Sequence, residues 1–122
     1  MTREDDYFLL FQEPNDPDFR KIIRILKLSH RDLSRIFDVQ ESGIRTDIKA
    51  SKEQQKAYYL WGEILNLVGK FLQSEEKAVF WFQIYNPILK MRPVDLIHKN
   101  ESHKLKQFVA QSIEQNKNAE TK

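Results

Sequence analysis

The apolar residues of this chain recur at intervals of three and four positions, which is the spacing of one face of an α-helix. The longest such stripe follows Ser51. Its apolar positions are Ala57, Leu60, Trp61, Ile64, Leu65, Val68, Phe71 and Leu72. Only three glycines and four prolines interrupt the 122 residues. The pattern therefore predicts an all-α protein organised around one long helix.

Residues that cap a helix N-terminus mark where the predicted helices begin, because their side-chain oxygens accept bonds from the first backbone N–H groups. Ser29 with Asp32, and Ser51 with Gln54, have the spacing of a capping box. Pro93 fits the first turn of a further helix. Helices are predicted over about 18–27, 29–38, 41–47, 51–72, 75–84 and 93–98, with a last one from Asn100 or Ser102 to about 114.

This pattern divides the chain into four segments. They are an N-terminal arm or lone short strand over 1–17, a helix-turn-helix lobe over 18–50, a long connecting helix with a compact C-terminal helical lobe over 51–114, and a polar, frayed tail over 115–122. Residues 1–18 hold six acidic residues and one arginine, whereas 19–49 hold eight basic and four acidic residues. The basic segment suits a polyanionic partner, provided that its charges share one face.

Residues 28–45 fit the register of a DNA-binding helix-turn-helix. The positions expected to be buried between its two helices are Leu33, Phe37, Val39 and Ile44. Asp38 stands in the turn, where a left-handed backbone is needed, and Asp tolerates it better than most residues. The first helix would touch phosphates and the second would face base edges. The candidate DNA-binding residues are Arg31, Arg35, Gln40, Glu41, Ser42, Arg45 and Thr46.

A helical trio with solvated arginines and lysines that never meets DNA fits the same residues. Glu41 and Asp47 would repel phosphates, and Gly43 weakens the helix that should read the bases. Two interpretations stay open: a lobe that reads paired half-sites as a homodimer, and a lobe whose reading helix is degenerate. The long helix, with Trp61 and Phe71, is a candidate dimer interface.

The order of helix stops and starts between residues 74 and 113 is distinctive. A helix that opens at Ser74-Glu75-Glu76 and carries Trp81-Phe82 ends at Asn86-Pro87, because the residue before a proline disfavours α geometry. After Ile88-Leu89 and a short connection, Arg92-Pro93 starts the next helix, and an amphipathic helix follows. Two helix ends and an irregular loop on a helical frame often form a contact surface. A tight corner of a helical bundle fits this spacing equally well.

These motifs resemble the C-terminal toxin-binding domain of the MbcA/ParS/Xre antitoxin family, whose members pair with RES-domain toxins. The resemblance covers about residues 65–113, and more loosely the helix-turn-helix segment, which such antitoxins usually carry in front. Where the family commonly has a glycine pair in the connection, this chain has Lys90-Met91. The turn therefore has to form without the freedom of glycine at positive φ.

The resemblance implies an antitoxin that binds a cognate RES-type toxin, covers the toxin's NAD-handling site and represses its own operon. The toxin-binding residues to which it points are Asn86, Pro87, Leu89, Arg92, Pro93, Lys99 and Lys104. The expected partners are the toxin, operator DNA and a second copy of the chain, with no cofactor or metal. The alternatives are a stand-alone helix-turn-helix transcriptional regulator and a partner-binding protein with a degenerate DNA-binding helix.

Signals for catalysis are weak throughout the chain. It has no cysteine, which excludes disulfides, thiolate metal sites and a cysteine nucleophile. Among the scattered histidines, only His98 stands at metal-ligand spacing from a carboxylate, that of Asp95. No apolar run approaches a membrane span, and the acidic start of the chain does not look like a signal peptide. We therefore expect a cytoplasmic protein that is not an enzyme and does not enter a membrane.

Overall fold

A long central helix organises the structure, a computed structural model that describes residues 5–120 and their side chains up to Lys117. The helical elements in this range are α1 Phe19–Ile25, α2 His30–Phe37, the 3₁₀ turn η1 Glu41–Gly43, α3 Lys52–Leu72, α4 Glu75–Gln83, α5 Pro93–His98 and α6 Ser102–Glu120. No strand occurs among the described residues, where the extended pairing consists of one isolated bridge between Asn86 and Met91. The predicted all-α fold, with a long helix joining N- and C-terminal helical parts, is confirmed.

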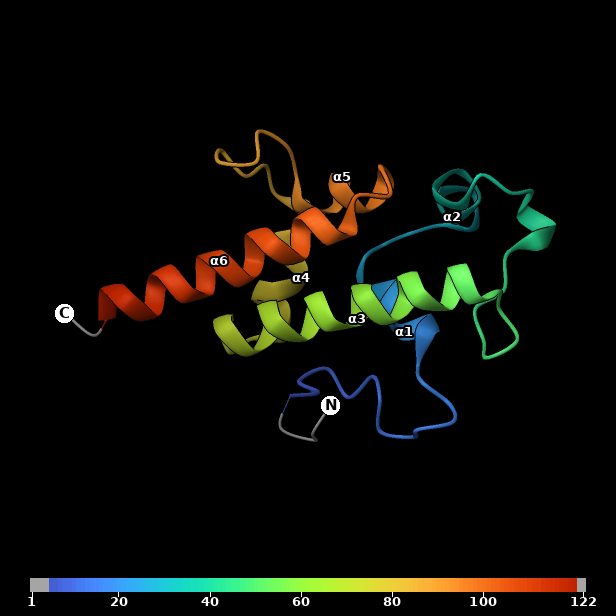
Figure 1. The fold of residues 1–122 in the computed structure, drawn as a ribbon, viewed down its shortest axis with the longest axis horizontal. Coiled ribbons are helices and arrows are strands. Elements are labelled where there is room, and N and C mark those ends of the chain that lie inside the picture. Colours follow the sequence, from blue (N-terminus) through green and yellow to red (C-terminus); the bar gives the residue numbers. More distant parts are fainter. Residues whose placement is uncertain (1–4, 121–122) are drawn as a thin grey trace.

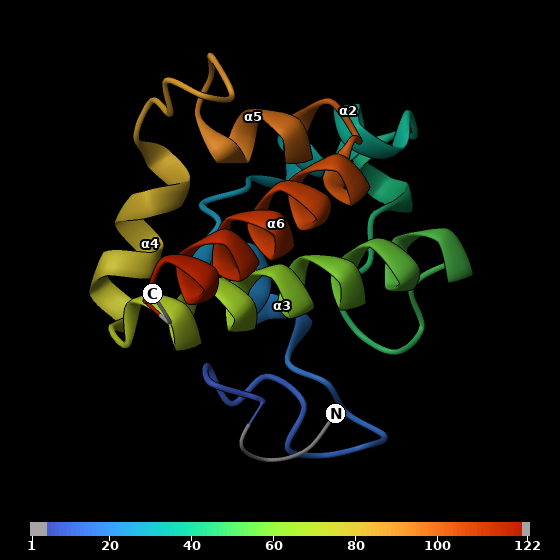
Figure 2. The ribbon, with the colours of Figure 1, turned by 60° about the vertical axis from the view of Figure 1, so that its left-hand side comes forward.

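The helices are grouped around α3. α6 runs beside α3 and the two form the middle of the molecule (Figure 1), while α1 and α4 also pack on α3. α5 lies against α2, α4 and α6, so it links the two helical groups. In Figure 2 the loop between α4 and α5 projects beyond the helices, and the N-terminal arm lies across α3 from it. The arm and the loop thus lie on opposite sides of α3.

One hydrophobic core runs through both groups, and it includes Trp61 of α3. The Trp61 ring stacks on Phe37 of α2, with centroids 5.9 Å apart, and its Nε1 donates a 2.7 Å hydrogen bond to Ser102 Oγ of α6. Only 1% of Trp61 is exposed. It is therefore not available for the dimer interface to which the sequence assigned it.

Serines cap three of the helices as predicted. Ser29 caps α2 and forms a complete capping box with Asp32, with bonds of 3.0 and 2.8 Å. Ser51 caps α3, but the predicted box with Gln54 is wrong. The Gln54 side chain turns instead to the preceding loop, where it accepts from Arg45 N at 3.1 Å and donates to Gly43 O at 3.0 Å. It satisfies backbone groups that the loop leaves unpaired.

The N-terminal arm is packed on α3 through a buried carboxylate. Asp6 is 2% exposed, and Asn66 Oδ1 of α3 fixes the arm further by accepting a 2.9 Å bond from Phe8 N. The Asp6 carboxylate accepts bonds of 2.7–3.0 Å from Leu10 N, Phe11 N, Gln12 Nε2 and Asn66 Nδ2. Burial alone would raise the pKa of Asp6, but these hydrogen bonds lower it below the ordinary 3.8.

Two glycines of α3 make room for the arm. A Cβ atom at Gly69 would lie 2.6 Å from Tyr7 Cδ1, and one at Gly62 would lie 2.4 Å from Phe11 Cζ. Gly69 thus marks a close approach of the arm to α3. Residues 1–4 of the predicted arm lie outside the described residues.

The C-terminal end of the chain differs from the prediction. α6 continues to Glu120, so residues 115–120 of the predicted frayed tail are helical, and 121–122 lie outside the described residues. The sequence pattern ended the helix where the apolar stripe ends. Helical hydrogen bonding continues past that point because polar residues of good helix propensity, such as Gln115 and Lys117, follow.

Candidate functional site

The segment predicted to read DNA has no second helix. Residues 41–43 make one 3₁₀ turn, and Ile44 continues in an extended conformation with φ −87° and ψ 126°. The predicted helix over 41–47 is therefore wrong. Gly43 disfavours a helix, and α3 binds the backbone groups that a helix would pair internally: Tyr58 Oη donates to Arg45 O at 2.8 Å, beside the two bonds of Gln54. A single turn is too short to lie along a major groove.

The predicted DNA-binding residues are not gathered on one helix. Arg31 and Arg35 lie exposed, one turn apart on α2, while Gln40, Glu41 and Ser42 are exposed at the 3₁₀ turn. Arg45 Nη2 forms a 3.3 Å ion pair with Asp47, and Thr46 Oγ1 accepts a 3.3 Å bond from Arg20.

The buried positions of the predicted helix-turn-helix are mostly correct. Leu33, Phe37 and Ile44 are buried, and Asp38 has the expected left-handed backbone, with φ 54°. Val39 is 40% exposed, so its predicted burial is wrong. It follows the end of α2, where no second helix is present to cover it.

The loop between α4 and α5 is a tight turn closed by Asn86. Asn86 N donates to Met91 O at 2.9 Å, and Lys90 N donates to Asn86 O at 2.8 Å. The Asn86 side chain accepts from Ile88 N at 2.9 Å and from Leu89 N at 3.2 Å. Lys90 has φ 60°, the left-handed region that glycine enters more readily. The bonds of Asn86 thus hold a lysine in a backbone conformation that favours glycine.

Arg92 fixes the exit of this loop. Its Nη2 donates to Asp95 Oδ1 at 2.9 Å, its backbone N donates to Asp95 Oδ2 at 2.9 Å, and its Nη1 lies 3.5 Å from Gln83 Oε1 of α4. Burial alone would raise the pKa of Asp95, but the bonds and charge of Arg92 lower it. Arg92 therefore ties α4 to α5. Its partner Asp95 is engaged here, and no group of three potential metal ligands occurs in the described part of the chain.

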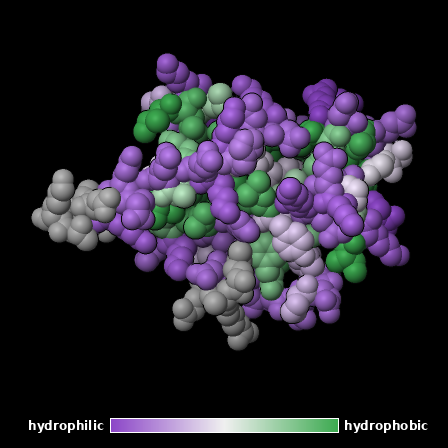
Figure 3. All heavy atoms as spheres, in the orientation of Figure 1, coloured by the Kyte–Doolittle hydropathy of each residue, from purple (hydrophilic) through white to green (hydrophobic). Residues whose placement is uncertain are grey.

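Large apolar side chains are exposed around this loop. Ile88 is 79% exposed, Phe80 65% and Tyr85 59%, and Phe71 and Ile84 are also exposed. We call these five residues the apolar surface. In Figure 3, green spheres gather at the upper left, where Figure 1 places the loop between α4 and α5. Phe71, which the sequence placed at a candidate dimer interface, is thus exposed, and Phe80 is exposed although apolar residues at helical spacing are ordinarily buried. Soluble proteins rarely expose large contiguous apolar patches outside binding sites.

A groove of about 200 Å³ lies beside Ile88, between the end of α3, α4 and α6. Its walls are mostly apolar. The lining residues are Val68, Phe71, Leu72, Trp81, Asn86, Ile88, Phe108, Val109, Ser112 and Ile113. A groove of this kind accepts apolar side chains of a partner. The groove and the apolar surface share Phe71 and Ile88, so they form one continuous candidate site.

The predicted toxin-binding residues fall into two groups. Asn86, Pro87, Leu89, Arg92 and Pro93 lie together in the loop and at its exit, although Pro93 is buried. The other group lies away from the loop: Lys99 is exposed after α5, and Lys104 forms a 3.3 Å ion pair with Glu101.

None of the exposed apolar residues was among the predicted toxin-binding residues, and only Phe71 was predicted at an interface, that of a homodimer. Apolar side chains at helical spacing are ordinarily core, so Phe80 and Ile84 looked structural. The position of Ile88, immediately after Asn86-Pro87 in an irregular loop, was the one available signal.

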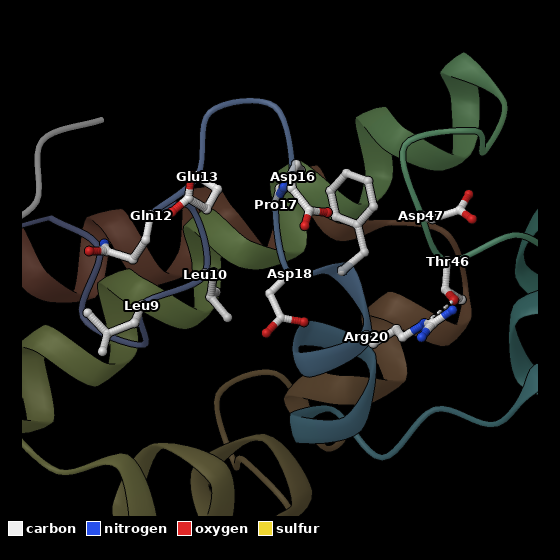
Figure 4. Close-up of a pocket in the computed structure, with 11 residues that line it drawn as sticks. Leu9, Leu10, Gln12, Glu13, Asp16, Pro17, Asp18, Arg20, Thr46 and Asp47 are labelled. Atoms are coloured by element: carbon white, nitrogen blue, oxygen red, sulfur yellow. Dashed lines mark hydrogen bonds between the residues drawn. The ribbon is translucent and has the colours of Figure 1, made fainter.

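A larger hollow, of about 560 Å³, lies between the arm, α1 and residues 46–47 (Figure 4). Four carboxylates line it: Glu13, Asp16, Asp18 and Asp47. Two of them are occupied by structural bonds, since Asp18 accepts from Lys21 N at 3.1 Å and Asp47 pairs with Arg45. Neither a histidine nor a nucleophilic serine lines the hollow. The arrangement therefore assigns no reaction to it.

Comparisons with known proteins add no family or relative to this geometry. No protein-family model matches the chain, and no curated protein matches it. Among the helices described, none combines the length and apolar composition needed to cross a membrane.

Proposed function

We propose that this protein binds another protein through the apolar surface, and that it serves as the antitoxin of a RES-type toxin. The observation that carries the proposal is the exposure of Phe71, Phe80, Ile84, Tyr85 and Ile88 around a loop held by hydrogen bonds. Covering such side chains gains about 25 cal/mol per Å² of apolar area, less the entropy cost of association. The RES-type partner comes from the resemblance of residues 65–113 to the antitoxin family.

Neutralisation would be steric. The loop, α4 and the groove stand on a core that includes Trp61 and Phe82, so the contact surface is largely formed before the partner arrives. A preformed surface loses less conformational entropy on binding. Docked on a toxin, the C-terminal lobe would block the entrance to the NAD-handling site without taking part in chemistry.

Operator binding by residues 40–46 is not part of this proposal. The segment has one 3₁₀ turn where a reading helix would be required, and Arg45 is paired with Asp47. A partner-binding protein with a degenerate DNA-binding helix agrees best with this geometry. A homodimer remains a prediction.

The direct test is co-expression with the protein encoded by the adjacent gene, if that protein has a RES domain. Rescue of growth from the toxin and co-purification of the two proteins support the proposal. Phe80→Asp places a charge in the apolar surface and should abolish both effects. Ile48→Asp is the matched control, because Ile48 is also an exposed apolar residue but lies before α3. Equal binding by both variants, or no binding by the unaltered protein, contradicts the proposal.

A further inference from the structure

We infer that Ile88 is the anchor of the proposed interface, and that it enters an apolar pocket of the partner whose rim carries a carboxylate facing Lys90. This inference rests on the proposed function and assigns the partner's chemistry at the same site. Its occupant is a folded protein surface with an apolar pocket and an acidic edge. Three properties of the loop between α4 and α5 support it: exposure, rigidity and charge.

Exposure singles out Ile88. At 79% it is the most exposed of the large apolar side chains described, and it stands in the loop that projects beyond the helices in Figure 2. It borders the groove between α3, α4 and α6 on one side of the loop. An apolar side chain that protrudes among other apolar side chains is placed as binding hot spots are, and Phe71, which lines the same groove, can help to exclude water around it.

Although Ile88 lies in a loop and not in a helix, as Phe71 and Phe80 do, its backbone is also held by hydrogen bonds. The Ile88 backbone N–H is bonded to Asn86 Oδ1 at 2.9 Å, and two further backbone bonds, Asn86 N to Met91 O and Lys90 N to Asn86 O, close the loop around it. Arg92 then fastens the loop exit to α5 through Asp95. Because the loop is already ordered by these bonds, little backbone entropy is lost when Ile88 is buried in a partner.

Charge defines the rim of the partner pocket. Lys90 and Arg92 are the two charged residues between α4 and α5, and both are cationic. Arg92 is neutralised by Asp95, whereas Lys90 is exposed and forms no ion pair within the described residues. A partner that buries Ile88 brings its own surface close to Lys90. A carboxylate there would be attracted to Lys90, and a cation would be repelled.

Titration calorimetry with the purified RES-domain protein of the adjacent gene tests the inference. Ile88→Ala should raise Kd at least tenfold, because truncated hot-spot residues commonly cost more than that. Its thermal unfolding should not change, since the side chain is exposed. Ile48→Ala is the matched control for an exposed isoleucine and should leave Kd within about twofold, as expected for a residue outside the interface.

Lys90→Glu tests the acidic rim. It should raise Kd severalfold and reverse the weakening of binding by added salt, because an attraction across the interface becomes a repulsion. Lys52→Glu is the control, because Lys52 is the first residue of α3 and lies outside the apolar surface. It should change neither Kd nor the salt dependence of binding. An Ile88→Ala or Lys90→Glu variant that binds like the unaltered protein overturns the corresponding half of the inference and leaves the proposed function intact. If the unaltered protein forms no complex, both fail.

Discussion

The two ends of α3 use their side chains in opposite ways. At the N-terminal end, Gln54, Gln55 and Tyr58 all bond to the backbone of the preceding loop, and Gln55 Nε2 alone donates to Ile48 O at 2.9 Å and to Ala50 O at 2.8 Å. At the C-terminal end, Phe71 is exposed and leads into the apolar surface. The first end is directed inward, to its own chain. The second leaves apolar area that a partner can cover.

This difference shows where the molecule is able to bind. Outside the apolar surface, the exposed large apolar residues Leu9, Val39, Ile48 and Tyr59 stand on separate segments: the arm, the end of α2, the loop before α3, and α3 itself. Scattered exposed apolar residues are ordinary on a protein surface. In the C-terminal lobe, the exposed apolar residues lie within 71–88 and border one groove. Concentration, and not the mere number of exposed apolar residues, distinguishes a candidate interface from a normal surface.

The largest effect is expected from breaking the core that joins the two ends. Phe37→Ala removes a ring that stacks on Trp61 and lies edge-on to Tyr58, with both centroid distances 5.9 Å. It should lower the free energy of unfolding by about 3–5 kcal/mol, because a cavity is left in the core. Urea unfolding followed by circular dichroism and by tryptophan fluorescence measures this loss.

The same experiment tests whether the two ends fold together. Trp61 reports on the junction and Trp81 on the C-terminal lobe, so coincident unfolding curves would indicate one cooperative unit. A variant in which the fluorescence and dichroism curves separate would mean that the C-terminal lobe is stable by itself, contrary to the shared core described above.

The next effect concerns the arm that covers α3. Asp6→Ala removes the acceptor of four hydrogen bonds and leaves the buried N–H of Leu10 and the partly buried N–H of Phe11 without this partner. The unfolding free energy should fall by about 2–3 kcal/mol. Glu13→Ala is the control: Glu13 is an exposed acid of the same arm, and its loss should change stability by less than about 0.5 kcal/mol. Equal stability of the two variants would mean that the arm is not held by Asp6.

The contribution of Asp6 should also depend on pH. Its pKa is lowered in the folded protein, so the folded state favours the charged carboxylate. The stabilisation is fully present above the ordinary carboxyl pKa of 3.8 and is lost as the pH falls through the lowered value. The stability difference between the unaltered protein and Asp6→Ala should therefore be constant near neutral pH and shrink below about pH 4. A difference that grows on acidification would contradict the assigned sign.

Much of the fold was predictable because it depends on local signals. Ser29, Ser51 and Ser74 each mark a helix start through bonds that need no tertiary partner, and Pro93 starts α5 for the same local reason. The 3.6-residue apolar period located α3. The predicted helix starts and the position of α3 are correct because the tertiary packing favours the same helices as the local sequence.

The failures occur where a distant residue decides the structure. Residues 41–47 form one 3₁₀ turn and no longer helix because Gln54 and Tyr58 of α3 bind their backbone, a pairing that no local pattern reveals. Phe80 and Ile88 are exposed because no part of the described chain covers them, although their residue type predicts burial. The sequence predicted the loop at Asn86 as part of a contact surface, but it did not predict that the apolar side chains around this loop are exposed.

A smaller effect should follow from loosening the loop of the C-terminal lobe. Arg92→Ala removes the bonds that tie the loop exit to Asp95 and Gln83. Because the pair is substantially exposed, stability should fall by no more than about 1 kcal/mol. Hydrogen exchange of the loop amides, which is sensitive to local opening, should accelerate more than exchange in α3. Unchanged exchange at Ile88 and Leu89 would show that Asn86 alone holds the loop. Lys70→Ala is the control, because it removes another exposed ion pair, with Asp5, and so measures the effect of losing an exposed ion pair elsewhere.

The smallest effect is expected at Arg45, whose substitution tests whether the N-terminal part of the molecule binds DNA. If residues 40–46 read an operator, Arg45→Ala would weaken promoter binding by several-fold and reduce its salt dependence. In this structure Arg45 pairs with Asp47 at 3.3 Å beside a single 3₁₀ turn, so neither change is expected. Fluorescence anisotropy with a labelled promoter duplex, over a series of salt concentrations, measures both quantities. A clear loss of affinity with a lower salt slope would return the reading role to the N-terminal end. An unchanged curve leaves the exposed C-terminal lobe as the part of this chain built for a partner.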